Sequence, residues 1–376
     1  MSETPTVIDL FAGVGGLSLG AARAGFRVLA AVENDPIALA SHAKNFPAVK
    51  HFSDDISKLK GADLLARIGI EKGELTGLIG GPPCQGFSNI GKRKEDDSRN
   101  YLFGHFFRLV DEIRPAFFVA ENVPGIRNPK YDRMREDAFA KVPDCYELFD
   151  PIVVRASSYG APTTRTRIFF IGYDPTKLAS LSPSDFAPPE DVETITVKDA
   201  LQGLPSEILD DWQSKDAEWG YVVKSNGSHY MTRIVGEIPS GVGDELAIRE
   251  YEESSLTSGC QGTRHVAEVV ERFSKLEQGQ TDSVSRAMRL NLSGFCPTLR
   301  AGTARDKGSY QAIRPVHPTE PRVITPREAA RLQGFPDWFV FHPTKWHSFR
   351  QIGNSVSPLV GEYLLSIIKK TLKART

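Results

Sequence analysis

The segment GLIGGPPCQGFS, residues 77–88, places Cys84 on a loop that two prolines stiffen and two glycines precede. Proline fixes the backbone φ angle and glycine permits an abrupt turn, so the thiol is expected where a short apolar strand ends. Ligands of open α/β sheets bind at that edge. A thiolate held there by cationic or backbone N–H neighbours can act as a nucleophile. The alternative, a buried structural cysteine, fits the prolines and the polar sequence that follows less well.

A second polar position follows the apolar run AFFVAENVPGI, residues 116–126, where Glu121 and Asn122 precede a proline turn. A carboxyl group at the end of a buried strand is desolvated, which favours its protonated form. It can then donate a proton to a ring nitrogen or engage an amino group, so Glu121 is a candidate general acid. Ordinary loop hydrogen bonding is the alternative interpretation of the same residues.

The segment DLFAGVGGLSLG, residues 9–20, indicates a nucleotide-like ligand. Its glycines at 13, 15 and 16 let the backbone turn tightly between a strand and a helix and approach a ligand, although the spacing is not G-x-G-x-x-G. Glu33 follows the next apolar run, where an acidic group accepts hydrogen bonds from ribose hydroxyls, and Asp55 follows a third. An adenosine-containing cofactor is favoured. A plain strand-to-helix turn, with Glu33 and Asp55 as helix caps or surface carboxylates, is the alternative.

These loops need a sheet to hold them, and the first 172 residues alternate short apolar runs with helical patterns. That alternation predicts an α/β fold: a doubly wound, mostly parallel sheet with crossover helices. From about residue 174 the sequence becomes rich in Pro, Ser and acidic residues, and one segment, residues 265–276, has a clear helical pattern. A smaller, irregular second domain is expected there. The segment ITPREAARLQGFP predicts a helix that braces it, with Pro326 in its first turn and Gly334 at its end. The C-terminal run 357–374 predicts an amphipathic helix that packs on the first domain.

Composition excludes several classes of protein. The 376 residues are 40% hydrophobic and 25% charged, as in a soluble chain that can bury a large core. The N-terminus lacks a secretory pattern and no run approaches a membrane span, so we expect a cytoplasmic protein that does not contact membranes. The four cysteines are far apart without a CxxC pair, so neither a metal site nor a disulfide framework is expected.

The charge is distributed unevenly. Residues 1–280 carry 31 Lys and Arg against 41 Asp and Glu, a net charge of −10, whereas residues 281–376 carry 15 against 6, a net charge of +9. The basic end is a candidate face for a polyanion. A solvated basic surface without a partner explains the charge equally well.

Seven motifs together resemble those of the DNA cytosine-5 methyltransferases, in the same order and at similar spacing. They cover residues 7–172 and about 315–367. The motifs are DLFAGVGG, VEND, GGPPCQGFS, ENVPG, RTRIFFIG, ITPREAARLQGFP and QIGNSVSP. The Pro-Cys and Glu-Asn-Val elements are the most specific of them. The likeness is to bacterial or phage enzymes of the restriction-modification type.

This resemblance implies the chemistry. Cys84 matches the family nucleophile that adds to C6 of a cytosine, so that C5 can accept a methyl group from S-adenosyl-L-methionine. Glu121 matches the carboxyl that engages N3 and the amino group of the base. Arg165 and Arg167 match two arginines that position the base and its backbone. Attack on C6 requires access to the ring face, so the base must be flipped out of the duplex.

The resemblance also carries over a cofactor site, and basic and polar loops indicate a set of DNA contacts. The implied cofactor residues are Phe11, Ala12, Gly13, Gly15, Gly16, Glu33, Asn34, Asp55, Ile56, Pro83, Leu102, Asn354, Ser355 and Val356. The expected DNA contacts are Gln85, Ser88, Lys92, Arg93, Arg300 and Arg305. For the basic segment that holds the last two, a solvated loop is the alternative. Two departures affect details: Thr163 stands where the family has Gln, and Asn34 stands where a bulkier residue often packs on the adenine.

The family pattern implies a catalytic domain of residues 1–173 and 345–376 and a target-recognition domain of residues 174–344. The expected partner is double-stranded DNA, and the expected state is a monomer with a cognate restriction endonuclease encoded nearby but not bound. A tRNA cytosine methyltransferase has a similar core but a shorter recognition region. A non-catalytic DNA- or cofactor-binding module would not need Cys84 and Glu121, and a nicotinamide dehydrogenase would not explain the cysteine loop.

Overall fold

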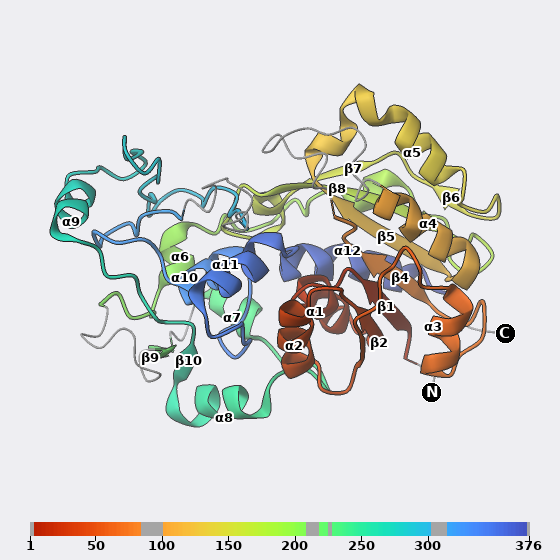
Figure 1. Cartoon of the computed structure of the whole chain (residues 1–376), viewed down its shortest axis with the longest axis horizontal. Coiled ribbons are helices and arrows are strands. Elements are labelled where there is room, and N and C mark those ends of the chain that lie inside the picture. Colours follow the sequence, from red (N-terminus) through yellow and green to blue (C-terminus); the bar gives the residue numbers. More distant parts are fainter. Residues whose placement is uncertain (1–3, 84–100, 208–217, 225–227, 302–313, 374–376) are drawn as a thin grey trace.

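The computed structural model describes residues 4–83, 101–207, 218–224, 228–301 and 314–373. Within these residues a central eight-stranded sheet has the order β3-β2-β1-β4-β5-β8-β6, and β7 also pairs with β8 (Figure 1). Its strands are β1 (Thr6–Leu10), β2 (Arg27–Val32), β3 (Lys50–Phe52), β4 (Gly77–Gly80), β5 (Phe117–Asn122), β6 (Glu147–Leu148), β7 (Ile152–Arg155) and β8 (Thr166–Tyr173).

The sheet is mostly parallel, as predicted. The strands β1 to β5 pair in parallel, whereas β8 runs antiparallel to β5, and β6 and β7 run antiparallel to β8. The sequence order reverses between β1 and β4, which lie side by side, and a ligand crevice forms outside the carboxyl ends of strands at such a point. The glycine loop follows β1 and the Pro-Pro loop follows β4, so both end at this crevice.

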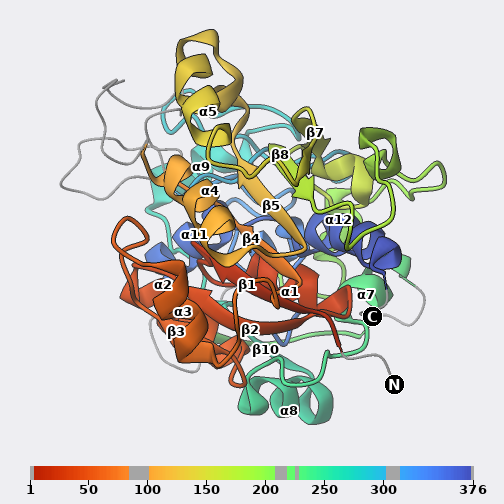
Figure 2. The same ribbon diagram turned by 90° about the vertical axis from the view of Figure 1, so that its right-hand side faces the viewer.

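Helices cover both faces of the sheet, as Figures 1 and 2 show from two sides. Alternate residues of β1 supply the two cores: Val7 belongs to the cluster with Leu17 of α1 (Gly16–Arg23), and Ile8 to the cluster with Phe106 of α4 (Tyr101–Ile113). Such two-sided burial is typical of parallel strands. The other helices of this part are α2 (Pro36–Asn45), α3 (Gly61–Ile68) and α5 (Asp132–Phe139).

The C-terminal helix α12 (Pro358–Thr371) packs against α1, which confirms the predicted amphipathic helix and its partner. The two helices approach very closely where Gly20 meets Gly361. A Cβ added at Gly20 would lie 2.7 Å from the backbone nitrogen of Glu362. The first and the last helix of the chain therefore lie in the same helical layer, on one face of the sheet.

The residues after β8 form short, irregular elements, as the sequence indicated. They are α6 (Val197–Leu201), β9 (Trp219–Tyr221), α7 (His229–Val235), α8 (Glu245–Ser254), β10 (Leu256–Ser258), α9 (Ala267–Ser274), α10 (Pro326–Gln333) and α11 (Lys345–Asn354). The predicted helix at 265–276 is α9. Helix α10 has the expected proline in its first turn, a capping box between Thr325 and Glu328, and Gly334 as its C-cap. No described helix is long and apolar enough to cross a membrane.

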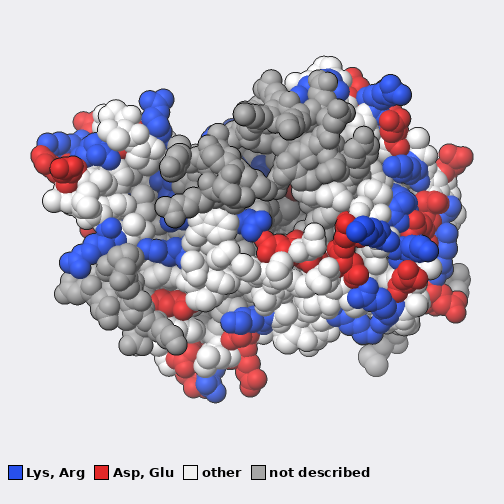
Figure 3. Space-filling model, viewed as in Figure 1, with Lys and Arg blue, Asp and Glu red and all other residues white. Residues whose placement is uncertain are grey.

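A single hydrophobic cluster joins this second part to the sheet. Leu332 of α10 and the fully buried Trp338 pack in the same cluster as Leu17 and Leu359. Helix α10 is therefore fixed to the sheet by packing, as expected for an element that braces the irregular region. On the face drawn in Figure 3, basic and acidic side chains lie side by side over the right-hand part, which carries the sheet.

Candidate active site

The glycine loop after β1 is held by Glu33. The backbone N–H of Gly13 donates to Glu33 Oε2 at 2.9 Å, and the N–H of Asp35 donates to Oε1 at 2.8 Å. Burial raises the pKa of Glu33, and these two hydrogen bonds oppose that shift. Phe11 and Gly13 have positive φ angles of 59° and 56°, and a Cβ at Gly13 would meet nothing within 4 Å. The loop thus presents open backbone and a fixed carboxylate to one space.

The second wall of this space comes from the end of β5. Arg167 Nε lies 2.6 Å from Glu121 Oε1, and the two side chains are only 15% and 10% exposed. A Cβ at Gly81 would lie 3.1 Å from Glu121 Oε2, so the Pro-Pro loop passes directly beside this carboxylate. The side chain of Asn122 donates from Nδ2 to the carbonyl oxygen of Pro82 at 3.2 Å. Strand ends β4 and β5 are therefore fastened together next to the Glu121–Arg167 pair.

Arg165 connects this wall to the second part of the chain. Its buried side chain donates from Nη1 to the carbonyl oxygen of Leu299 at 3.3 Å. Thr163 is also fully buried and forms a parallel β-bridge with Cys296. Its hydroxyl accepts from the backbone N–H of Arg165 at 3.3 Å. Thr163 therefore contacts both Arg165 and the segment around Cys296. This is the structural role of the position at which the family has Gln.

The third wall is the end of α11. Residues Ser355 and Val356 lie so close to Gly16 that a Cβ there would collide with the Ser355 hydroxyl and the Val356 carbonyl. One turn earlier on the helix, Arg350 Nη1 lies 2.5 Å from Asp35 Oδ2. Asp35 in turn caps α2 through the N–H groups of Ile37 and Ala38. The C-terminal motif is in this way clamped onto the loops after β1 and β2.

Together these walls enclose a cavity of about 280 Å³. Most of the catalytic and cofactor residues predicted from the sequence line it: Phe11, Ala12, Gly13, Gly16, Glu33, Pro83, Glu121, Arg165, Arg167, Asn354, Ser355 and Val356. Segments from both ends of the chain therefore converge on one space at the carboxyl edge of the sheet. The arrangement offers both a nucleotide-like cradle and a buried acid–arginine pair.

Other predicted residues lie elsewhere. Gly15 faces the rings of Phe46 and His42, and Asn34 is exposed. The carboxylate of Asp55 accepts from the N–H and hydroxyl of Ser57, and these hydrogen bonds lower its pKa. Gly15, Asn34 and Asp55 do not line the cavity, and neither do Ile56 and Leu102. Arg300 is exposed, and the residue after it, Ala301, lies against Gly353 near the cavity. The predicted residues outside the described part of the chain are Cys84, Gln85, Ser88, Lys92, Arg93 and Arg305.

The sequence interpretation missed three charged residues that line the cavity, namely Asp9, Asp35 and Arg350. Arg350 lies four positions before Asn354 on α11, so helical spacing could have placed it on the same side. Asp35 follows the Glu33 motif by two positions. Asp9 lies on β1, where a lone acidic residue within a buried strand is the signal.

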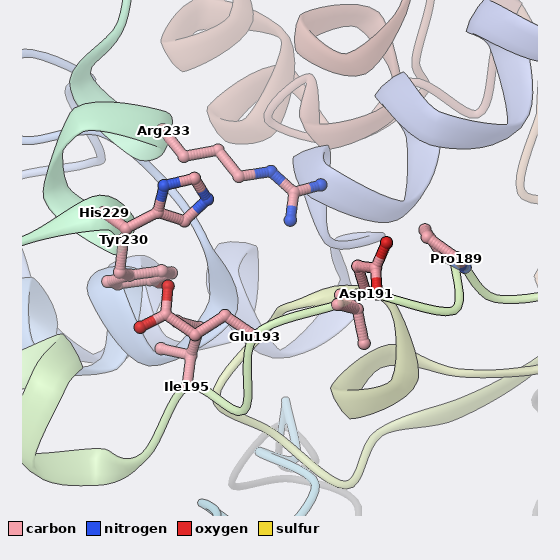
Figure 4. A pocket seen from close by; sticks show the side chains of 8 residues that line it. Pro189, Asp191, Glu193, Ile195, His229, Tyr230 and Arg233 are labelled. Atoms are coloured by element: carbon pink, nitrogen blue, oxygen red, sulfur yellow. The ribbon is translucent and has the colours of Figure 1, made fainter.

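A second, smaller cavity of about 220 Å³ lies away from these motifs (Figure 4). Asp191 and Glu193 line one side, and His229 and Arg233 of α7 line the other. Arg233 is engaged with the carbonyl oxygen of Tyr159 at 3.0 Å. None of the residues predicted from the sequence borders this cavity. Among the described residues, no group of three or more His, Cys, Asp or Glu side chains could hold a metal ion.

Comparison with known proteins decides the family. The model of the C-5 cytosine-specific DNA methylase family matches residues 5–370. The chain belongs to this family. The methyltransferase is 40% identical over 374 residues to the Type II methyltransferase M.XorII of Xanthomonas oryzae pv. oryzae, covering 99% of this chain and 86% of the relative. It is 32% identical to the Type II methyltransferase M.DdeI of Desulfomicrobium norvegicum, covering 95% and 87% of the two chains.

A solved structure confirms the fold. A crystal structure from E. coli, described as a prophage-encoded DNA modification methyltransferase, superposes with a TM-score of 0.88 at 50% identity and covers 98% of this chain and 99% of its own. The S. pombe Dnmt2 methyltransferase superposes with a TM-score of 0.61 at 18% identity, which supports the fold alone. The enzyme is thus a C-5 cytosine-specific DNA methyltransferase with a Rossmann-like sheet.

Proposed function

We propose that this methyltransferase moves the methyl group of S-adenosyl-L-methionine to C5 of a cytosine flipped out of a specific double-stranded DNA sequence. The observation that carries the proposal is one cavity that holds both sets of residues. The glycine loop and Glu33 form its cofactor side, and the Glu121–Arg167 pair beside Pro82 and Pro83 forms its base side. A methyl donor and an acceptor base could therefore meet without either leaving the crevice.

The residues present fit this cofactor. Both oxygens of Glu33 are oriented by backbone N–H groups, and the remaining lone pairs can accept hydrogen bonds from ribose hydroxyls. The open space at Gly13 and the tight contact of Gly16 with the Ser355 and Val356 segment leave a narrow cradle that larger side chains would fill. When bound, the cofactor supplies an electrophilic methyl group on a sulfonium. Asn34, Asp55, Ile56, Leu102 and Gly15 remain proposed as supports of the cradle on their motifs alone.

On the base side, each step follows from the residues assigned by their motifs. The Cys84 thiolate would add to C6, which makes C5 a nucleophile toward the methyl group that the bound cofactor would supply. A base or water would then take the C5 proton, and the thiolate would be eliminated as the ring double bond reforms. Glu121 engages N3 and the amino group, which neutralises the charge that develops on the ring. Arg167 holds the Glu121 carboxyl in place, and Arg165 ties this wall to Leu299.

The relatives named Type II methyltransferases support a restriction-modification role, with a cognate endonuclease encoded nearby but not bound. We propose a monomer that acts on DNA in the cytoplasm. Its catalytic domain would comprise residues 1–173 and 345–376, and its recognition domain residues 174–344. DNA would be held by Arg300 and by residues outside the described part of the chain: Gln85, Ser88, Lys92, Arg93 and Arg305.

Methylation of genomic DNA tests the proposal. The protein is expressed in cells without cytosine methyltransferases, and the DNA is sequenced after bisulfite conversion. Protected cytosines within one short sequence context are expected with the wild-type protein and not with Cys84→Ser. If transfer RNA were methylated and DNA were not, the alternative substrate would be established. If neither nucleic acid were methylated, the proposal would be overturned.

A further inference from the structure

A chain of buried polar side chains leads away from the cofactor side of the cavity. Ser18 Oγ lies 2.6 Å from Asp9 Oδ2, His42 Nε2 lies 3.1 Å from Ser18 Oγ, and His51 Nε2 lies 2.9 Å from His42 Nδ1. Asp9, Ser18 and His42 are buried, whereas His51 is half-buried. We call these four residues the buried chain. It joins the carboxyl group of Asp9, which lines the cavity, to His51, which is partly exposed to solvent.

The buried chain has two complete hydrogen-bonding patterns. With Asp9 ionised, each neutral histidine donates from Nε2, and the Ser18 hydroxyl donates to the carboxylate. With Asp9 protonated, every bond reverses: the carboxyl donates to Ser18, Ser18 donates to His42 Nε2, and His42 donates from Nδ1 to His51 Nε2. Each of the three hydrogen bonds within the buried chain is kept in either pattern. The two protonation states of Asp9 are therefore both accommodated, and the proton enters or leaves at His51.

The surroundings hold Asp9 near its point of titration. Burial raises its pKa to about 7, the Ser18 hydroxyl opposes the shift, and the nearby Glu33 carboxyl adds to it. Burial also keeps His42 neutral by lowering its pKa well below 6.5. The residues paired with Asp9 on the neighbouring strands are apolar, Ala31 on β2 and Ile79 on β4.

The other charged or titratable groups of the cavity are mostly engaged. Asp35 forms an ion pair with Arg350, and Glu121 forms one with Arg167. Glu33 accepts hydrogen bonds from two backbone N–H groups. Arg165 and His347 also line the cavity. Asp9 differs from the other carboxylates in that the partner identified for it is a hydroxyl, which can donate or accept. Its charge can thus change without breaking an ion pair.

We propose that Asp9 is a specificity-determining residue that favours binding of the positively charged methyl donor over binding of its neutral product. The carboxyl group of Asp9 is ionised when the methyl donor is bound and protonated when the product is bound. This inference rests on the proposed function. Methyl transfer converts a sulfonium cation into a neutral thioether and leaves the rest of the molecule unchanged. A cation in the cavity favours ionised Asp9, and its loss favours uptake of one proton from solvent through the buried chain. Release of the product is thereby favoured.

Calorimetry of S-adenosylmethionine and S-adenosylhomocysteine binding tests the inference, between pH 6 and 8 and in buffers of different ionisation enthalpy. In the wild-type protein, the preference for S-adenosylmethionine should increase about five- to tenfold from pH 6 to 8, as expected for a difference of about one pKa unit between the two complexes. Binding of the charged ligand should release more protons than binding of the neutral one. Both effects should be lost in Asp9→Asn. The ligands' own amino and carboxyl groups titrate alike with either protein, so they cancel in this comparison.

Two further variants separate the possible causes. Glu33→Gln should weaken both ligands together, because the ribose is common to both, and should keep a pH-dependent preference whose midpoint lies at lower pH, because the Glu33 carboxyl raises the pKa of Asp9. Ser18→Ala should move the midpoint of the preference to higher pH, because ionised Asp9 loses its hydrogen-bond donor. An Asp9→Asn protein that binds ligand and keeps the wild-type pH dependence would overturn the inference. Absence of binding of either ligand to the wild-type protein would instead overturn the proposed cofactor.

Discussion

Asn122 Nδ2 donates to the carbonyl oxygen of Pro82 at 3.2 Å, and this hydrogen bond joins the end of β5 to the loop that leads into Cys84. The same side chain accepts from the backbone N–H of Val123 through Oδ1 at 2.9 Å. Asn122 is 1% exposed, so both of its polar ends are committed to backbone partners away from water. The proposed acid and the proposed nucleophile loop are thereby held at a fixed separation.

Replacement of Asn122 should loosen this connection. Asn122→Ala leaves the Pro82 carbonyl and the Val123 N–H without their side-chain partner, which is expected to cost about 1–3 kcal/mol of stability. Because the loop is no longer fastened, kcat for methyl transfer should fall more than affinity for the cofactor. Steady-state kinetics with calorimetry measures both. An unchanged kcat in a folded variant would show that the loop is positioned by other interactions.

Glu33→Ala should weaken cofactor binding by about 1–3 kcal/mol, because the ribose hydroxyls and the Gly13 N–H lose a buried acceptor. DNA affinity should change much less. Asp54→Ala is the matched control, since this nearby carboxylate pairs with Arg67 at 2.6 Å and does not line the cavity. Equal effects of the two substitutions on cofactor affinity would contradict the role of Glu33. Asp55→Ala, measured beside them, tests the role that its motif assigns.

Asp9 should make stability depend on pH. Its pKa is raised to about 7 in the folded protein, against about 3.9 in an unfolded chain. The folded state therefore binds more protons between these values, and stability falls as pH rises through this window. Relative to wild type, Asp9→Asn should gain about 2–3 kcal/mol in free energy of unfolding between pH 5 and 8. Urea unfolding at both pH values measures this gain, and parallel behaviour of the two proteins would contradict the raised pKa.

The Arg300 and Arg305 pair should contribute to DNA binding through phosphates. Neutralising both should lower affinity and flatten the slope of log affinity against log salt by about 1 for each phosphate that is no longer neutralised. If one of them reads a guanine edge, the weakening will be confined to specific duplexes and will amount to about 1–3 kcal/mol. Titrations of specific and scrambled duplexes at several salt concentrations separate these outcomes. Unaltered affinity and slope on both duplexes would remove this segment from the interface.

Much of the fold could be predicted because its signals are local. The apolar runs indicated the strands, and turn residues marked where they end, so the glycine loop, Glu33 and Glu121 were expected at one edge of the sheet. Pro326 and Gly334 bounded α10 for the same reason: a proline is tolerated in the first turn and a glycine permits the left-handed C-cap. The antiparallel direction of β8 has no such local signal.

The parts that could not be predicted depend on interactions between distant positions. Arg350 and Asp35 are separated by 315 positions, and only the closure of α11 onto α2 brings them together. The buried chain likewise combines residues from β1, α1, α2 and β3 whose types alone indicate nothing. Thr163 was noted as a departure from the family, but its bridge to Cys296 required the path of the second part of the chain.

Trapping of the enzyme on DNA tests the central claim most directly. A duplex that carries the target sequence with 5-fluorocytosine at the methylated position is incubated with the protein and S-adenosylmethionine. Fluorine cannot leave C5 as a proton does, so a covalent protein–DNA adduct should accumulate on a denaturing gel, with Cys84 as the attached residue. Cys84→Ser should form no adduct and should lose methyl transfer while keeping its cofactor affinity. Absence of an adduct with an active wild-type enzyme, or near-normal turnover by Cys84→Ser, would contradict the mechanism.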